Sequence, residues 1–291
     1  RKRRGMIEKI TRKSMIIRPS GRSTDFITPS FGYGCLYNCS YCYMKRHRPT
    51  GLTVATNTGD ILTAVNNHAF FTPVDKPNQT HAEFTTYDIS CNEDFCLHAK
   101  YHEWEGIFDF FKYHPIAMGS FATKFVNKKL LSFDPERKIR IRFSLMPQKM
   151  ADIHEPNTSK IIDRIRAIND FIEAGYDVHI NFSPVIITDT WRNDYARLFE
   201  GVDAIVDRKY KSRVQAEVIF LTHNFKKHTA NMLAHPATEK DLWVPSKQEA
   251  KISQYGGENV RYKLGFKSEY IQEFTELHNQ IIPWNTIRYI F

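Results

Sequence analysis

The sequence predicts an α/β fold, a partial (β/α)6 barrel followed by a small C-terminal extension. Three observations lead to this prediction. Strand-like and helix-like segments alternate along the middle of the chain, about six such units occur, and 291 residues with 42% hydrophobic content can bury one large core. Such alternation favours parallel strands with helices packed outside them.

The predicted strands are short runs rich in Ile, Val, Phe and Thr, either apolar throughout or alternating with polar residues. Six of them occupy Asp25–Phe31, Ala82–Ser90, Met118–Lys124, Ile139–Leu145, Asp177–Ile187 and Gln215–Thr222. A short last strand is expected over Thr286–Phe291. Loops at the carboxyl ends of barrel strands carry the chemistry, so residues just after these runs are candidates for an active site.

Helical segments separate the strands. They are expected at Thr58–Phe71, Tyr101–Tyr113, Thr158–Ala174 and Asp189–Val206, with a later helix at Lys267–Gln280. The third shows the clearest pattern, because four isoleucines recur at helical spacing from Ile161 to Ile172 and Gly175 follows as a stop.

Three regions follow from this pattern: a basic N-terminal segment over residues 1–24, the barrel over 25–235, and an extension over 236–291 that completes the substrate site. The stretch from Ala237 to Gly257 is polar and without a clear period, so we expect a connector there.

Composition indicates an intracellular, cytoplasmic protein. No run approaches the roughly 18 apolar residues of a membrane span, and Arg1–Arg4 lacks the apolar region of a secretory signal. Five cysteines, three of them within eight positions, favour a metal or redox site over disulfides. The net charge of +9 suggests a polyanionic partner such as nucleic acid.

A cysteine loop with the spacing C-x3-C-x2-C is formed by Cys35, Cys39 and Cys42. Three thiolates on one tight loop can ligate three irons of a cubane cluster and leave the fourth iron open to another ligand. A structural zinc site would need a fourth protein ligand, for which His47 is a candidate. Three unligated core cysteines are the remaining alternative.

This spacing, with the aromatic Tyr43 after the third cysteine, resembles the signature of the radical S-adenosylmethionine (SAM) superfamily. The resemblance implies a [4Fe–4S] cluster whose open iron binds SAM. One-electron reduction, by a donor such as flavodoxin or ferredoxin, would then release a 5′-deoxyadenosyl radical that abstracts hydrogen from carbon.

Further segments resemble the spore photoproduct lyase family, in the same order along the chain. They are Tyr87–Cys91, Phe121–Lys124, Ile141–Ser144, Glu155–Ser159, Ala174–Tyr176, Ser183–Ile186, Trp191–Tyr195 and Ile287–Ile290. The family's two basic stretches that meet DNA are only partly kept, at Leu221–Lys227 and Lys251–Gly257.

The resemblance implies roles for several residues. Cys91 would give a hydrogen atom to the product radical, and Tyr41 and Tyr43 would relay the thiyl radical back toward SAM. Cys96 is close enough to compete for the donor role. The alternatives are a buried, inert Cys91 and tyrosines that only pack.

The resemblance also implies contacts to SAM from Tyr43, Ser90, Lys124 and Ser144. Lys124 and Ser144 end successive predicted strands, and Ser90 stands where the superfamily often has a glycine-rich run that holds the SAM amino group.

A basic, aromatic-interleaved surface is expected near the C-terminus, with phosphate and stacking contacts to DNA. Its members are Lys226, Lys227, Tyr255, Arg261 and Tyr262, beside Phe225, His228, Lys251 and Lys263. The alternative is a solvated basic edge.

The leading prediction is therefore a radical SAM lyase that splits a spore-photoproduct-like thymine lesion in DNA. A second hypothesis is radical SAM rearrangement or hypermodification of a modified pyrimidine, as in viral DNA. A third is a zinc-stabilised nucleic-acid-binding module without catalysis.

Overall fold

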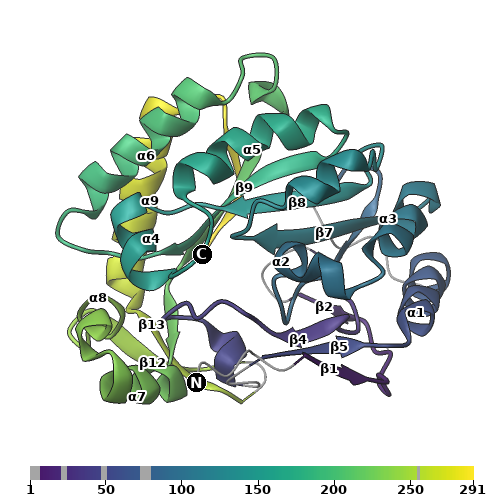
Figure 1. Cartoon of the computed structure of the whole chain (residues 1–291). Coiled ribbons are helices and arrows are strands. Elements are labelled where there is room, and N and C mark those ends of the chain that lie inside the picture. Colours follow the sequence, from purple (N-terminus) through teal and green to yellow (C-terminus); the bar gives the residue numbers. More distant parts are fainter. Residues whose placement is uncertain (1–6, 21–24, 47–50, 73–79, 254–255) are drawn as a thin grey trace. The chain divides into compact units, whose positions relative to one another are not determined.

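The computed structural model describes residues 7–20, 25–46, 51–72, 80–253 and 256–291 (Figure 1). The chain divides into two compact units. The first comprises Arg1–Leu36, Arg48–Phe143 and Ala167–His179, and the second comprises Tyr37–His47, Ser144–Arg166 and Ile180–Phe291.

The main sheet has eight strands in the order β14-β10-β9-β8-β7-β6-β3-β2. Their bounds are β2 Arg18–Pro19, β3 Phe26–Ile27, β6 Thr85–Asp88, β7 Ala117–Thr123, β8 Ile139–Ser144, β9 Asp177–Val185, β10 Gln215–Phe220 and β14 Thr286–Ile290. Strands β3, β6, β7 and β8 pair in parallel in that order, as do β9, β10 and β14, whereas β2 is antiparallel to β3. The predicted α/β class with parallel strands is confirmed.

Strand β8 shows why its sequence suits this sheet. Successive side chains of a strand point to opposite faces, so the apolar residues of β8 lie on one face and its arginines on the other. Phe143 packs on Phe171 of α5 with ring centroids 5.4 Å apart. On the opposite face Arg142 pairs with Asp88 at 3.1 Å. The helix-facing side is therefore apolar, and the other side carries buried charges.

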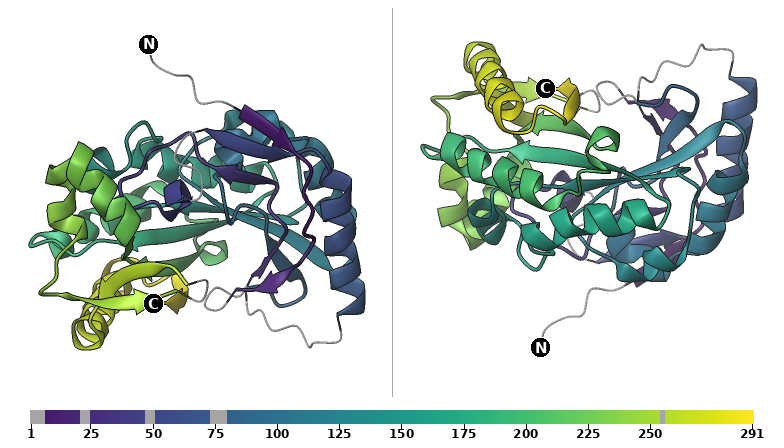
Figure 2. Two further views of the ribbon diagram at one scale, coloured as in Figure 1. Left: turned by 90° about the horizontal axis from the view of Figure 1, so that it is seen from below. Right: turned by 90° about the horizontal axis from the view of Figure 1, so that it is seen from above.

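The helices are α1 Thr58–Phe71, α2 Phe95–His98, α3 Trp104–Tyr113, α4 Gln148–His154, α5 Ile161–Glu173, α6 Trp191–Ile205, α7 Phe225–Ala234, α8 Glu239–Leu242 and α9 Leu264–Ile281. Helix α1 has the predicted bounds, and Gly175 ends α5 with a φ of +94°. A Cβ there would lie 1.9 Å from Asp134 Oδ1, so glycine is required. Helix α9, the yellow helix in Figure 2, packs on α6. The contact includes the rings of Phe199 and Phe274, whose centroids are 5.4 Å apart.

Two smaller sheets differ from the prediction. The run Asp25–Phe31 forms only the short β3. The Thr28 N–H still bonds to the Asp88 carbonyl at 3.2 Å, but the chain then bends at Pro29, which has no N–H to continue the pairing. It continues into β4, Gly32–Gly34, which joins β5, Leu52–Ala55, and β1, Ile7–Ile10, in the order β1-β5-β4.

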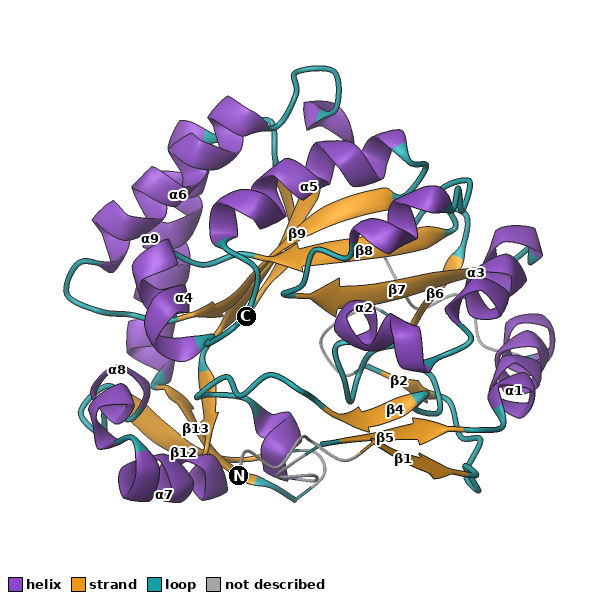
Figure 3. Cartoon of the chain, in the orientation of Figure 1, coloured by secondary structure: helices purple, strands orange, loops and turns teal. Residues whose placement is uncertain are grey.

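The expected connector 237–257 is wrong, since it contains α8 and β12, Gln248–Ile252. Strand β12 pairs with β13, Glu258–Tyr262, which also pairs with β11, Thr222–Asn224 (Figure 3). Only Gln248 in β12 is buried, so the strand carries little apolar pattern and its conformation depends on pairing. The last strand, β14, lies in the main sheet rather than in a separate extension. Among the helices of the described residues, none is long and apolar enough to cross a membrane.

Candidate active site

The cysteine loop follows β4 directly. Cys35 and Cys39 are buried and Cys42 is partly exposed, and all five cysteines, which lie in the described part of the chain, are outside disulfides. The Cys42 N–H donates to the Cys39 carbonyl at 3.2 Å, which closes a tight turn between these two. Three soft thiolate donors of this kind suit an iron–sulfur cluster. The alternative zinc ligand His47 lies outside the described residues.

Glycine before the loop is required by packing. A Cβ on Gly32 would lie 2.5 Å from both carboxylate oxygens of Glu93, so only glycine allows this approach. Glu93 Oε2 lies 3.0 Å from His98 Nδ1 and 2.9 Å from His102 Nε2. The far nitrogen of His98, Nε2, accepts the Leu36 N–H at 3.2 Å. Glu93 therefore supports the backbone next to Cys35 through His98.

The charge state of Glu93 suits this task. Burial would raise the pKa of its carboxyl, but His102 and His98 outweigh burial and lower that pKa. The ionised carboxylate accepts from both rings, which leaves His98 Nε2 as the acceptor for Leu36.

Ser40, between Cys39 and Cys42, is held by His154 at the end of α4. The Ser40 N–H donates to the His154 carbonyl at 2.9 Å, and Ser40 Oγ lies 2.7 Å from His154 Nδ1. Burial lowers the pKa of His154, while Asp241, 3.6 Å from Nε2, opposes this shift. Asn231 Nδ2 donates to the Ser40 carbonyl at 2.8 Å. The N–H and the carbonyl of Ser40 are thus both held by buried hydrogen bonds.

Tyr41 is held by Glu155, the residue that follows His154 in the chain. Its hydroxyl donates a very short hydrogen bond to Glu155 Oε1. Glu155 Oε2 pairs with Arg164 Nη2 at 2.8 Å, and both of these side chains are fully buried. Arg164 Nη1 in turn donates to the Ser144 carbonyl at 2.8 Å. Burial first and the Glu155 charge second raise the pKa of Tyr41 well above its ordinary value, so its phenol keeps its proton at neutral pH.

The sequence prediction missed these supporting residues. Glu155 was noted only as part of the run Glu155–Ser159, and no role was given to His98, His154 or Asn231. That run forms a turn in which Asn157 has a φ of 67° and Thr158 bonds back to Glu155, so α5 begins at Ile161 rather than Thr158.

The two candidate donor cysteines differ in environment. Cys91 follows β6 and is partly exposed. Cys96 is fully buried, and its thiol donates to the Phe125 carbonyl at 3.3 Å. Burial strongly raises the pKa of the Cys96 thiol. Tyr43, at the start of a 3₁₀ turn, is 46% exposed.

The expected SAM contacts occupy different settings. Thr123 of β7 pairs with Phe143 of β8, and Lys124 and Ser144 follow them at the carboxyl ends of these strands. Lys124 is half-buried and Ser144 is buried. The Ser90 hydroxyl donates to the Glu93 carbonyl at 2.6 Å and accepts the Phe95 N–H at 3.2 Å. The Ser90 hydroxyl therefore stabilises the turn between Ser90 and Phe95.

The expected DNA surface is only partly on the outside of the molecule. Lys226 is exposed, and Lys227 Nζ lies 3.5 Å from Asn38 Oδ1. Arg261 pairs with Glu249 at 3.0 Å. Tyr262 is 1% exposed and its hydroxyl accepts the Ile187 N–H at 2.9 Å, so a stacking role for this ring is wrong. Tyr255 lies outside the described residues.

The sequence of the chain matches one family of known proteins. The family model for spore photoproduct lyase matches residues 3–291. The chain is 28% identical over 250 residues to the spore photoproduct lyase of Bacillus subtilis (strain 168), covering 84% of this chain and 70% of that protein. It is 25% identical over 250 residues to the enzyme of a Geobacillus species, with the same coverage.

Solved structures show the same fold. A spore photoproduct lyase complexed with dinucleoside spore photoproduct matches with a TM-score of 0.85 and 21% identity, over 98% of this chain and 82% of that one. A mutant lyase with bound AdoMet and dinucleoside spore photoproduct matches with a TM-score of 0.86 and 20% identity, with the same coverage. The predicted partial barrel is confirmed, and the match over residues 3–291 shows that the chain belongs to the spore photoproduct lyase family, whose members are radical SAM lyases.

Proposed function

We propose that this chain splits spore photoproduct in DNA by radical SAM chemistry. The observation that supports this most directly is the cysteine loop, whose backbone is held on either side of Ser40 and next to Cys35 by buried polar partners. Buried partners of this kind orient ligands and are costly to remove. Relatives of the same family carry the activity in their names, and one solved relative holds dinucleoside spore photoproduct.

Cys35, Cys39 and Cys42 would hold a [4Fe–4S] cluster. With SAM bound at its open iron, and an electron from a donor such as flavodoxin or ferredoxin, the cluster would supply a 5′-deoxyadenosyl radical for hydrogen abstraction. Lys124 and Ser144 are the residues of this chain that we expect to contact SAM, together with Tyr43. Ser90 would contact SAM through its backbone, because its hydroxyl is already bonded to the Glu93 carbonyl.

Cys91 is the proposed hydrogen donor. Its S–H bond breaks, the hydrogen atom passes to the thymine-centred product radical, and a thiyl radical remains on Cys91. Partial exposure supports this choice over Cys96, whose thiol is buried and bonded to the Phe125 carbonyl.

Tyr41 would restore Cys91 with the help of Glu155. The Cys91 thiyl takes one electron from Tyr41 and becomes a thiolate, which takes up a proton from solvent to restore the S–H bond. The phenolic proton of Tyr41 passes to the Glu155 carboxylate, and a tyrosyl radical remains. The hydrogen bond already in place makes Glu155 the acceptor. Reduction of Tyr41, with Tyr43 as the next relay, returns the proton.

DNA is the proposed partner, with Lys226 and Lys227 on its phosphates. The proposed setting is the cytoplasm. The test is anaerobic incubation of the reconstituted protein with SAM, dithionite and DNA carrying spore photoproduct, followed by chromatography of the digested nucleosides. We expect loss of the lesion and a matching gain of thymidine, both absent with Cys39→Ala. An unchanged lesion, or a rearranged nucleoside in place of thymidine, would contradict the proposal.

A further inference from the structure

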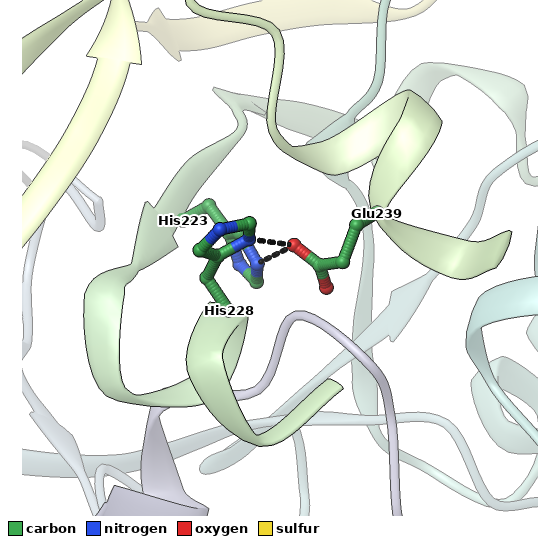
Figure 4. A group of neighbouring side chains, drawn as sticks. All are labelled: His223, His228 and Glu239. Atoms are coloured by element: carbon green, nitrogen blue, oxygen red, sulfur yellow. Dashed lines mark hydrogen bonds and ion pairs between the residues drawn. The ribbon is translucent and has the colours of Figure 1, made fainter. Parts of the chain in front are cut away.

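Two histidines and a glutamate meet in the second unit (Figure 4). His223 comes from β11, His228 from the first turn of α7, and Glu239 begins α8. Their ligand atoms all lie within 4.8 Å of one another. Glu239 Oε2 is 3.1 Å from His223 Nε2 and 2.5 Å from His228 Nδ1. Both rings therefore direct a nitrogen at the same oxygen.

The cluster is buried and negatively charged when both rings are neutral. The side chain of His223 is 0% exposed, that of Glu239 is 4% exposed and that of His228 is 18% exposed. Burial would raise the pKa of Glu239, but hydrogen bonds from His223, His228 and Asn231 outweigh it and lower that pKa. A buried carboxylate with two imidazoles is a donor set suited to a divalent cation.

We propose that His223, His228 and Glu239 bind one Zn²⁺ ion. Imidazole nitrogen and carboxylate oxygen are both zinc ligands, and a set of two histidines and one glutamate leaves the fourth position to water. Solvent reaches the site on the side of His228. The indole of Trp243 stacks on the His228 ring, with centroids 4.0 Å apart and planes 14° apart, and so holds its orientation.

The ion would brace the cysteine loop from outside. Glu239 Oε1 accepts a very short hydrogen bond from Asn231 Nδ2, and the same Nδ2 donates to the Ser40 carbonyl. A cation on Glu239 would fix this carboxylate, and with it the amide that supports the peptide between Cys39 and Cys42. The site therefore joins β11, α7 and α8 to the loop. This inference is independent of the proposed function, because metal binding can be counted without activity.

The test counts zinc in the complete protein. The iron-reconstituted protein is dialysed anaerobically against a chelator-buffered series of Zn²⁺ concentrations, and zinc and iron are measured by mass spectrometry. We expect one zinc per chain in addition to the iron. Glu239→Gln and His228→Ala should weaken zinc binding at least about 100-fold. The control His235→Ala, an exposed histidine at the end of α7, should retain it.

X-ray absorption at the zinc edge identifies the ligands in the parent protein, so the result does not depend on the folding of a variant. Zn–N and Zn–O distances of about 2.0–2.2 Å support the proposal, whereas Zn–S distances of about 2.3 Å would place the metal on cysteines and overturn it. Parent protein that takes up no zinc across the series also overturns it, as do Glu239→Gln and His228→Ala variants that bind zinc like the parent.

Discussion

Tyr41 donates its phenolic hydrogen bond to Glu155, a residue 114 positions later in the chain. Tyr41 lies between the second and third cysteines, and Glu155 is paired with buried Arg164. A phenol in the cysteine loop is thus hydrogen-bonded to a buried carboxylate. This carboxylate can accept the phenolic proton when the tyrosine loses an electron.

Glu155→Gln should slow turnover while 5′-deoxyadenosine is still formed in a first turnover. An amide cannot take up the phenolic proton, and positioned proton acceptors contribute about 10²–10⁴-fold. The variant should also lose about 3–5 kcal/mol of unfolding free energy, because Arg164 is left buried and unpaired. Single-turnover and steady-state assays, with denaturant unfolding, measure both effects.

Tyr41→Phe is the matched control for Glu155→Gln, since it removes the phenol and keeps the Glu155–Arg164 pair. It should reproduce the loss of turnover and cost much less stability. Normal multiple turnover in Tyr41→Phe would remove Tyr41 from the relay.

Replacing Cys35, Cys39 or Cys42 by Ala should abolish the iron–sulfur absorbance and 5′-deoxyadenosine formation, because three thiolates are the ligands available to the cluster. Cys96→Ala should retain both, since the Cys96 thiol faces the Phe125 carbonyl in the core. Iron content, the visible spectrum and chromatography of adenosine products give the comparison. Iron loss in Cys96→Ala would mean that the ligand set is misassigned.

Cys91→Ala should still hold the cluster and cleave SAM. Its product radical, without a nearby hydrogen donor, should persist and be quenched by solvent, reductant or another side chain. We expect slower formation of thymidine and new adducts in the mass spectrum of the digested DNA. The donor role of Cys91 is excluded if the variant yields the parent's products at the parent's rate.

DNA binding should weaken with salt, with a log–log slope of about −0.9 for each neutralised phosphate. Lys226→Gln with Lys227→Gln should flatten that slope, because both residues lie at the start of α7 and Lys226 is exposed. Tyr262→Phe should leave the slope unchanged and lower stability by about 1 kcal/mol, since its hydroxyl accepts the buried Ile187 N–H. Fluorescence anisotropy of labelled DNA at several salt concentrations measures the slope for each variant, and denaturant unfolding measures the stability of Tyr262→Phe.

Asp177 should make stability depend on acid pH. Burial alone would raise the pKa of this carboxyl, but His179 and Arg140 lower it far below its ordinary value. Because the folded pKa is depressed, the stabilisation is present above the unfolded pKa of about 3.9 and is lost as the pH falls below it. Asp177→Asn should be less stable at pH 7 and show a shallower fall between about pH 5 and pH 3. If the free energy of unfolding falls equally steeply with pH in parent and variant over that range, this account is contradicted.

The local parts of the fold could be predicted from the sequence. Helix α1 and the end of α5 at Gly175 follow from periodicity and backbone conformation, which depend on neighbouring residues. Strand β12 could not be predicted in the same way, because its mostly polar residues become a strand only through pairing with β13.

The sequence by itself determined the spacing of Cys35, Cys39 and Cys42, and with it the metal chemistry that we propose, because candidate ligands on one short loop need no distant partner to be recognised. Only the tertiary structure decided that Glu155 meets Tyr41, that His223 and Glu239 converge, and that the Tyr262 ring is buried. Each of these depends on a partner in another element of the fold. Such contacts are set by the packing of whole elements, and no local pattern of residues contains them.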